Sequence, residues 1–557
     1  MTQSHVFSDF FEPTTLAIYF LAAPLGLALL YVVFPHFTSL SPLRRYPGPF
    51  WAGFTRLWLA KQARVGKRSE IVHEEHLKHG KFVRIGPNEI SVADPAALPI
   101  VYAHGTGSIK ADFYDAFVAS PVRGLFNTRN RAEHTRKRKI VSHTFAPKSV
   151  REFEPYIAST VNILLRKWDD LAAKARKTSS GAGGDRMKGY AVVESLDWFN
   201  ALAFDIIGDL AFGSPFGMLE RDAADIVTIT KEDGTVIHAG GVQILNERGE
   251  YSATLGCLPP WVRPYMKYID PWFARGLASV KNLTGIARTR VNERLQQGAF
   301  DRKDILSHLQ AGRDENGQPM SKDELTMEAL TQLIAGSDTT SNSSWYVLLS
   351  PCLSLVSGAD SATAPDSAIL YQIVKTPNAY KKLQQELDEA FAGKGMSGVL
   401  EYDDVKALPY LGACINEALR RHSTSGIGLP RIMMDDTEVL GEVFPKGTVL
   451  SVPSYTIHWS TEFWGPDAAE FKPERWLESE EKTRKLEKQL NVFSYGPRSC
   501  VGRNVAMIEL FCFMATLVYR YDFKLVDPDQ KLEVVEGFLR KPTGCMMGFK
   551  LRGESAQ

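Results

Sequence analysis

The segment Phe493-Ser494-Tyr495-Gly496-Pro497-Arg498-Ser499-Cys500-Val501-Gly502-Arg503 decides how this chain is interpreted. It places one cysteine between two glycines, directly before an apolar, helix-forming run that begins at Asn504. Glycine has no side chain to clash, so such a loop can bring its backbone close to a flat ligand. The positive end of a helix dipole stabilises a thiolate, the form of cysteine that binds metal. The plainer interpretation is a buried structural cysteine, because free cysteine usually behaves as a small hydrophobe.

The full pattern Phe-x-x-Gly-x-Arg-x-Cys-x-Gly resembles the haem-binding signature of the cytochrome P-450 family. The resemblance implies that Cys500 is the axial ligand of a haem b iron, within a cofactor-binding loop that includes Phe493 and Gly502. It also implies that Arg498 and Arg431 bind the haem propionates. The expected fold is mainly α with a small β domain, over residues 50–557.

Composition excludes several other classes of protein. The 557 residues carry a net charge of +1, so no global field favours nucleic acid or acidic partners. The six cysteines contain no Cys-x-x-Cys pair, which argues against a zinc site or a redox dithiol. So few cysteines in so long a chain also argue against a disulfide framework.

The amino terminus predicts a membrane anchor. Residues 1–13 form a short tail, 14–36 the transmembrane segment and 37–49 a linker rich in proline and glycine. No Asp, Glu, Lys or Arg occurs from Pro13 through Leu43, and about 20 apolar residues span a bilayer. A cleaved signal peptide fits less well, since Asp9 and Glu12 stand where a signal peptide has basic residues.

The two arginines after this segment set its orientation. Basic residues flank membrane helices on the cytoplasmic side, and Arg44-Arg45 follow the apolar run. We therefore expect a single-pass protein of the endoplasmic reticulum membrane whose catalytic domain faces the cytoplasm. Asn282 and Asn342 match the glycosylation pattern but should be unmodified in that topology.

A second signature lies in a predicted helix that starts near residue 321. Ser321-Lys322-Asp323-Glu324 is a capping box, and the helix that it opens contains Ala335-Gly336-Ser337-Asp338-Thr339-Thr340. A glycine in mid-helix costs about 1 kcal/mol, so a purely structural helix would avoid it. The segment resembles the oxygen-binding turn of the family. There Ala335 and Gly336 leave room for haem and dioxygen, and Asp338 and Thr339 deliver protons during oxygen activation.

The basic run from Arg129 to Lys139 has two functional interpretations. His134 and Arg138 lie four residues apart on one helix face and could hold a carboxylate such as a haem propionate. In the family an aromatic residue, usually tryptophan, stands where this chain has His134. The remaining basic residues could form a docking patch for an acidic electron donor. A solvated basic face is the alternative without function.

Glu417 and Arg420 form a Glu-x-x-Arg pair, which by itself decorates many solvent-exposed helices. The resemblance implies that they join Arg475 in a buried charge network that locks the cysteine loop. Such a network belongs to the scaffold and is credible only if every partner is satisfied.

Several segments are similar to the fungal benzoate para-hydroxylase group of the family. They include Arg123-Gly124-Leu125-Phe126-Asn127-Thr128, Leu196-Asp197-Trp198-Phe199-Asn200, Ser341-Asn342-Ser343-Ser344 and Ser423-Thr424-Ser425. The resemblance implies insertion of one oxygen atom from O2 into an aromatic ring carbon para to a carboxylate. Electrons would come from NADPH through a membrane-bound cytochrome P-450 reductase, and a b-type cytochrome is left open as a further partner.

Because a buried carboxylate needs partners, the substrate anion should be held by hydroxyl or cationic groups. The candidates are Arg123, Ser423, Thr424 and Ser425. The alternatives are a monooxygenase for another aromatic or xenobiotic substrate, a reductase-independent haem-thiolate isomerase and a non-catalytic haem sensor. Asp338 and Thr339 argue against the last two, which need no proton delivery.

Four further segments carry structural expectations. Lys81–Val92 predicts a β-hairpin, Leu196–Leu219 a core helix, and the segment around Gly537-Phe538 a last hairpin. Residues 448–456 look β-like, whereas 222–250 are polar and predict an irregular, mobile access region.

Residues 345–367 suggest a retained intron. The family keeps the helix after Ser344 intact, whereas Pro351 would break it at a cost of about 3 kcal/mol or more. Trp345-Tyr346-Val347 can be encoded with GTATGT, a common fungal intron start, and Ser367 can supply the closing AG. Splicing would join Ser344 to one new cysteine and then to Ala368. The competing interpretation is a genuine surface loop, which a fold can accommodate at modest entropic cost.

We predict that the mature transcript lacks the codons of this segment. Sequencing of that transcript, together with peptide mapping of the native enzyme, provides the measurement. A tryptic peptide that contains Cys352-Leu353-Ser354-Leu355 in the native enzyme would refute the intron hypothesis.

Overall fold

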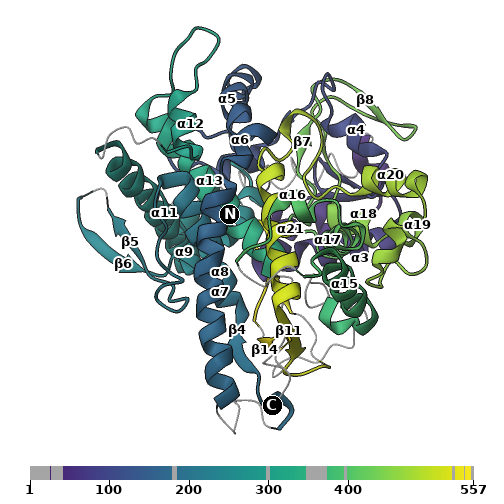
Figure 1. Cartoon of the computed structure of the whole chain (residues 1–557). Coiled ribbons are helices and arrows are strands. Elements are labelled where there is room, and N and C mark those ends of the chain that lie inside the picture. The colour runs from purple at the N-terminus through teal and green to yellow at the C-terminus, as the bar shows by residue number, and fades with distance from the viewer. Residues whose placement is uncertain are drawn as a thin grey trace, which may run out of the picture.

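Helices form most of the molecule, and the sheets lie at its edges (Figure 1). The computed structural model describes residues 26, 42–177, 185–231, 233–296, 302–345, 373–393, 398–529, 533–544 and 546–553, without the side chains of 338–345. The α-helices are α2 (Leu57–Val65), α3 (Arg68–His79), α4 (Ala97–Tyr102), α5 (Arg131–Thr144), α6 (Pro147–Arg151), α7 (Glu154–Lys177), α8 (Ser195–Phe212), α9 (Gly241–Cys257), α10 (Met266–Ile269), α11 (Pro271–Gln296), α12 (Ile305–Ala311), α13 (Lys322–Trp345), α15 (Pro377–Ala390), α16 (Tyr402–Val405), α17 (Pro409–Arg421), α18 (Ser454–Trp459), α19 (Thr461–Trp464), α20 (Glu480–Gln489) and α21 (Arg503–Arg520).

Helix α13 runs through the middle of this helical body and packs against α8, α11, α12 and α21. Its start is fixed by the predicted capping box. The backbone N–H of Glu324 donates to the Ser321 hydroxyl at 3.2 Å, and the N–H of Ser321 donates to the Glu324 carboxylate at 3.1 Å. Both groups would otherwise be unpaired donors at the helix end, so the sequence sets where α13 begins.

The largest sheet has five strands in the order β1-β2-β10-β7-β3, and a second has the order β11-β14-β4. Strand β3 brings Lys110 directly opposite Arg431 of β7. The strands are β1 (Phe82–Gly86), β2 (Glu89–Val92), β3 (Ile109–Lys110), β4 (Ala191–Glu194), β5 (Val227–Thr230), β6 (Val236–Ala239), β7 (Arg431–Ile432), β8 (Thr437–Val439), β9 (Glu442–Phe444), β10 (Val449–Ser451), β11 (Tyr521–Leu525), β12 (Val534–Glu536), β13 (Arg540–Pro542) and β14 (Met546–Leu551). Short 3-10 helices that matter below are η3 (Phe50–Gly53), η4 (Asp112–Phe117), η6 (Arg263–Tyr265), η7 (Pro473–Trp476) and η8 (Gly496–Arg498).

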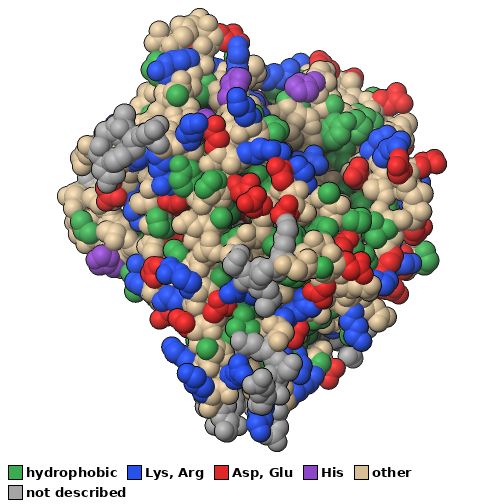
Figure 2. All heavy atoms as spheres, viewed as in Figure 1, with side chains coloured by type: hydrophobic (Ala, Val, Ile, Leu, Met, Phe, Trp, Pro, Cys, Tyr) green, Lys and Arg blue, Asp and Glu red, His purple; other side chains and the backbone are tan. Residues whose placement is uncertain are grey.

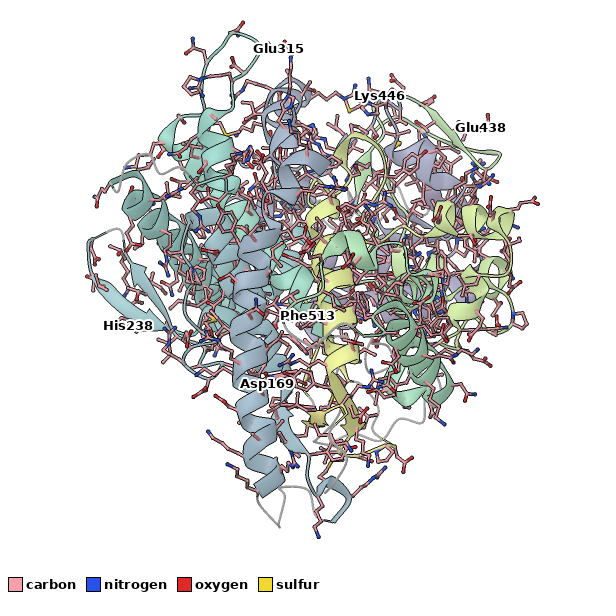
Figure 3. The ribbon with its side chains drawn as sticks, viewed as in Figure 1. Asp169, His238, Glu315, Glu438, Lys446 and Phe513 are labelled. Carbon is pink, nitrogen blue, oxygen red and sulfur yellow. The ribbon has the colours of Figure 1, made fainter. Side chains whose placement is uncertain are left out.

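The main core lies between α7, α8, α13 and α21. Phe513, labelled on α21 in Figure 3, packs its ring 5.2 Å from that of Phe199 on α8. Trp168 of α7 stacks at 4.5 Å on Phe549 of β14, and Asp169 beside it pairs with Arg520 at the end of α21. These contacts hold α21, which follows the cysteine loop, against the long helices. On the surface, acidic and basic side chains are intermixed over the face in Figure 2.

Most of the expected elements are confirmed. The hairpins β1–β2 and β12–β13 form where predicted, and Leu196–Leu219 is largely helix α8. Residues 448–456 are a strand only in part, because α18 begins at Ser454.

The expectation of an irregular region over 222–250 is wrong. This segment forms the hairpin β5–β6 and the first part of α9. Val227 and Ile229 alternate with exposed residues and bury their side chains in the core. The apolar residues are too sparse to reveal this from composition, and tertiary packing supplies the stability.

Two predicted segments fall outside the described residues: the anchor at 14–36, apart from Gly26, and the intron candidate after Trp345. Within the described ranges, no helix has the length and apolar character needed to cross a bilayer.

Candidate active site

The cysteine loop is held in one conformation by its backbone. Cys500 donates its N–H to the carbonyl oxygen of Phe493 at 2.8 Å, which closes the loop just before α21. Gly496 has φ of +72°, and a Cβ there would lie 2.0 Å from the carbonyl oxygen of Tyr102. Only glycine satisfies both conditions, so this position of the motif is required by the loop itself.

The Cys500 side chain is exposed, although many protein atoms surround its sulfur. Surrounding protein atoms desolvate the thiol and raise its pKa. Backbone N–H groups of Gly502 and Arg503 and the positive charges of Arg138 and Arg503 act in the opposite direction. Donors at the start of a helix favour the thiolate form of a cysteine. A metal ion bound at the sulfur would favour the thiolate further.

Four cations from four parts of the chain converge beside this loop: Arg138 of α5, Arg431 of β7, Arg498 of η8 and Lys110 of β3. Their donors reach neutral oxygens. Arg138 bonds Ser499 O at 2.7 Å, Arg498 bonds Thr128 O at 2.8 Å, Arg431 bonds the Tyr114 hydroxyl at 2.7 Å, and Lys110 bonds Phe126 O. None of the four forms an ion pair with any described residue.

The pKa values record the resulting repulsion. Burial, followed by the charges of Arg431, Arg498 and Arg138, holds the pKa of Lys110 well below its usual value. Burial and then Arg431 lower the pKa of Arg498 to about 10. Lys110 and Arg431 are also cross-strand partners, a placement that destabilises a sheet when the charges are alike. The cluster therefore suits an anion with more than one negative charge.

The sequence did not predict Lys110 as a site residue, because it belongs to no local motif. His134 is buried, and burial together with Arg498, Lys110 and Arg138 lowers its pKa to about 3. It is therefore neutral near pH 7 and can offer one N–H, so the positive charge of the predicted pair comes from Arg138 alone.

The predicted oxygen-binding turn lies on α13. Ala335 is exposed. A Cβ on Gly336 would lie 2.6 Å from Ile207 of α8, so this glycine permits the close contact of the two helices and is not explained only by room for a ligand. The side chains of Asp338 and Thr339 lie outside the described residues.

The structure brings Glu417, Arg420 and Arg475 together as a buried network. Glu417 accepts from Arg420 at 2.8 and 2.9 Å and from Arg475 at 2.9 Å. The indole N–H of Trp476 and the backbone N–H of Lys472 complete the set at 2.9 and 3.1 Å. Burial raises the pKa of Glu417, but the two arginines outweigh it and leave the pKa below its usual value.

His458, which the sequence analysis also missed, connects this network to the cysteine loop. Its backbone oxygen accepts from Arg420 at 2.8 Å, and its Nε2 accepts from the Asn491 N–H at 2.9 Å. Burial lowers its pKa to about 3, so the ring is neutral and its proton sits on Nδ1. That proton is donated to the Ser423 hydroxyl.

Two of the four candidate substrate anchors, Ser423 and Arg123, have side-chain partners within the protein. Ser423 is 1% exposed and turns its hydroxyl toward His458. Arg123 pairs with Asp115 at 2.8 Å and also bonds Asn127 O at 3.0 Å. The carbonyl of Thr424 accepts from the Arg540 N–H at 2.8 Å, and Ser425 is half-buried.

A sequence model of the family described as cytochrome P-450 matches residues 46–350 and 354–549. The chain belongs to the cytochrome P-450 family. It is 45% identical over 540 residues to benzoate 4-monooxygenase bphA of Aspergillus niger, an alignment that covers 95% of this chain and 97% of that relative. It is 27% identical to cytochrome P-450 monooxygenase gsfF of Penicillium aethiopicum, over 96% of this chain and 99% of that protein, and 28% identical to cicH of Emericella nidulans, over 92% and 94%.

Membership of the cytochrome P-450 family implies a haem-iron cofactor, and the residues present suit it. Haem carries two carboxylates, which match the unneutralised cations Lys110, Arg138, Arg431 and Arg498. A cysteine at the start of α21, supported by backbone N–H donors, suits a thiolate ligand to its iron. This P-450 is a monooxygenase, as its relatives are.

Replacement of Cys500 by serine or histidine should abolish the red-shifted carbonyl band of the reduced haem protein, because that band depends on a thiolate ligand. The measurement is the carbon monoxide difference spectrum. Cys512→Ala is the matched control, since Cys512 is buried in α21 and should leave the band in place. A normal band in either Cys500 variant would contradict the assignment.

Proposed function

We propose that this P-450 hydroxylates a small aromatic carboxylate, with benzoate at the para position as the first candidate. The observation that carries the proposal is the 45% identity to a benzoate 4-monooxygenase across nearly both chains. Other monooxygenases of the family match this chain over similar lengths at 27–28% identity. A monooxygenase for a different aromatic or xenobiotic substrate is the second candidate, since one fold can host sites for many different substrates.

In this proposal, one group of residues binds the cofactor and another transfers protons. Cys500 would bind the iron of haem b, while Lys110, Arg138, Arg431 and Arg498 hold the propionates and fix the orientation of the ring. When bound, haem supplies the chemistry that activates dioxygen for insertion into the substrate. Asp338 and Thr339, on α13, would move protons toward the reacting oxygen.

Electrons would come from NADPH through a cytochrome P-450 reductase. A b-type cytochrome is a further candidate donor for the second electron. Helix α5 supports a docking face for such acidic donors. Its Arg138 contacts the cysteine loop through Ser499 O, while Arg131 and Lys139 on the same helix are exposed. Charged patches of this kind steer encounter and make the rate sensitive to salt.

The reconstituted system tests the activity. With reductase, NADPH and benzoate, we expect substrate-dependent NADPH oxidation and 4-hydroxybenzoate as the product. Thr339→Ala should still bind haem and benzoate but divert most electrons to peroxide, because proton delivery is lost. Product identity, peroxide and NADPH are measured together. Hydroxylation at another ring position, or the absence of turnover with any aromatic acid, would refute the proposal, and unchanged coupling in Thr339→Ala would refute that residue's role.

We also propose that the enzyme is a single-pass protein of the endoplasmic reticulum membrane, with its catalytic domain in the cytoplasm. Besides the apolar run at 14–36, exposed aromatic and aliphatic side chains support this: Phe50, Trp51 and Leu57 in one segment and Trp261, Tyr265, Tyr268 and Ile269 in another. Both segments adjoin one core cluster, and Arg64 of α2 lies 3.7 Å over the ring of Trp272 in α11. Tryptophan and tyrosine favour the membrane–water interface.

The full-length protein should remain in the membrane fraction after an alkaline carbonate wash, since a spanning helix is not released by high pH. A variant that lacks residues 1–41 should still bind neutral lipid vesicles, and Trp261→Ser with Tyr268→Ser should weaken that binding several-fold. Complete release of the full-length protein by carbonate would contradict the anchor. A glycan on Asn282 in the native protein would contradict the orientation.

A further inference from the structure

The loop 123–128, which precedes α5, is held through its backbone. Three of its carbonyl oxygens accept hydrogen bonds from cations on three separate elements: Arg123 O from Lys137 of α5, Phe126 O from Lys110 of β3, and Thr128 O from Arg498 of η8 at 2.8 Å. Two of these cations, Lys110 and Arg498, are also expected to bind the haem propionates. The loop therefore shares its anchors with the cofactor.

The same loop contacts helix α13 through Gly124 and Leu125. A Cβ on Gly124 would lie 2.6 Å from the hydroxyl oxygen of Thr331 and 3.3 Å from the carbonyl oxygen of Met327, so the backbone packs directly on the helix. Leu125 donates its N–H to Oε1 of Glu328 at 2.8 Å. This hydrogen bond joins the loop to a helical side chain two turns before the predicted oxygen-binding turn.

The partner on α13 is a buried carboxyl that the protein satisfies only in part. Glu328 is 0% exposed, and its Oε2 has no hydrogen-bond partner among the described residues. Lys137 pairs instead with Glu133 at 3.3 Å and with Glu324 at 3.7 Å. Burying an incompletely paired carboxylate is costly, whereas a glutamine would accept the Leu125 N–H with no charge to bury. The contact with the loop alone does not explain a glutamate at this position.

The groups around Glu328 let it exchange a proton near neutral pH. Burial raises its pKa to about 7, against the charge of Lys137 and the hydrogen bond from the loop, which favour the ionised form. Glu324 of the same helix and Glu133 of α5 act in the same direction as burial. The ionised form in turn favours the charged form of Lys110 on β3. Because the closed structure raises this pKa, ionisation of Glu328 opposes the closed contact.

Phe126 connects the loop to substrate binding. Its half-buried ring lies 5.0 Å from Nζ of Lys110 and packs at 5.4 Å on the ring of Phe117 and at 5.2 Å on that of Phe538. This apolar surface therefore lies beside a cation expected to bind the cofactor. A shift of the loop backbone would move the ring and disturb the shared cations together.

We propose that Glu328 is a positioning residue for the substrate, which holds the loop 123–128 on α13 while it carries a proton and loosens that contact when it is ionised. The protonated carboxyl still accepts the Leu125 N–H through Oε1 and brings no charge into the interior. The proton is exchanged with solvent when the loop opens. The link to the substrate rests on the proposed function, whereas the contact between loop and helix does not.

Hydrogen–deuterium exchange of the haem-loaded, full-length enzyme tests the contact, with peptides that cover 123–128 read by mass spectrometry. In the wild type, protection relative to the intrinsic exchange rates should fall roughly 10- to 100-fold between about pH 6 and pH 8. The reason is that the stability conferred by a raised carboxyl pKa is lost as the pH rises from the ordinary value of that pKa to the raised one.

The variants separate the charge of Glu328 from its shape. Glu328→Gln should remove the pH dependence and keep, at both pH values, the protection that the wild type has at the lower one. Glu328→Ala should lose protection at both, because the Leu125 N–H is left unpaired. Asp323→Asn is the matched control, since Asp323 is an exposed acid of the same helix and should keep the wild-type behaviour. An unchanged carbonyl band shows that each variant holds its haem.

Two results of the exchange experiment would overturn the inference. One is protection of the wild-type loop that does not change with pH, and the other is the same pH dependence in Glu328→Gln as in the wild type. The second result would reduce Glu328 to a packing residue whose charge has no effect on the loop.

Difference spectra with benzoate test the link to the substrate. Glu328→Ala should weaken benzoate binding roughly five-fold or more at both pH values, and Glu328→Gln should stay within about two-fold of the wild type at the lower one. Wild-type benzoate affinity in Glu328→Ala would overturn the positioning role, even if exchange changes as expected. If the wild type binds no aromatic acid at all, the proposed function itself fails, while the exchange measurement still decides the loop contact.

Discussion

One buried carboxylate, Glu417, supports the region on which the chemistry depends. Burying a charge without partners is costly, but five donors satisfy its two oxygens and bind α17 to η7 and to the segment before it. Arg420 extends the network to the backbone of His458, and His458 fixes Asn491, two residues before Phe493. Phe493 in turn accepts the N–H of Cys500. The position of the sulfur is thus determined by a chain of satisfied hydrogen bonds.

The four cations beside that loop, unlike Glu417, have no partner of opposite charge among the described residues. Glu417 is fully paired inside the protein, whereas Lys110, Arg138, Arg431 and Arg498 repel one another and reach only neutral oxygens. The fold tolerates this because other contacts over-determine it: β3 and β7 pair in the main sheet, and α5 is held by its own core contacts. Binding of a dianionic cofactor relieves the repulsion, so its free energy adds to the stability of the folded state.

Two of the groups predicted to hold a substrate anion are already engaged within the protein. Ser423 contacts His458, and Arg123 pairs with Asp115. A group that is paired in this way must give up its partner before it can bind a ligand, which costs free energy when the partner is left buried.

The sequence by itself determined the local features: the cysteine loop, the capping box of α13, the hairpins β1–β2 and β12–β13, and the helix that carries Glu417 and Arg420. Each depends on residues a few positions apart, whose spacing reports turn geometry, helix capping or periodicity directly. Only the tertiary structure revealed Lys110 and His458, assigned Gly336 to the contact with Ile207, and turned 222–250 into a hairpin and a helix. These residues act through contacts between segments far apart in the chain. Burial, charge repulsion and interior space arise from that packing, and no local spacing in the sequence encodes them.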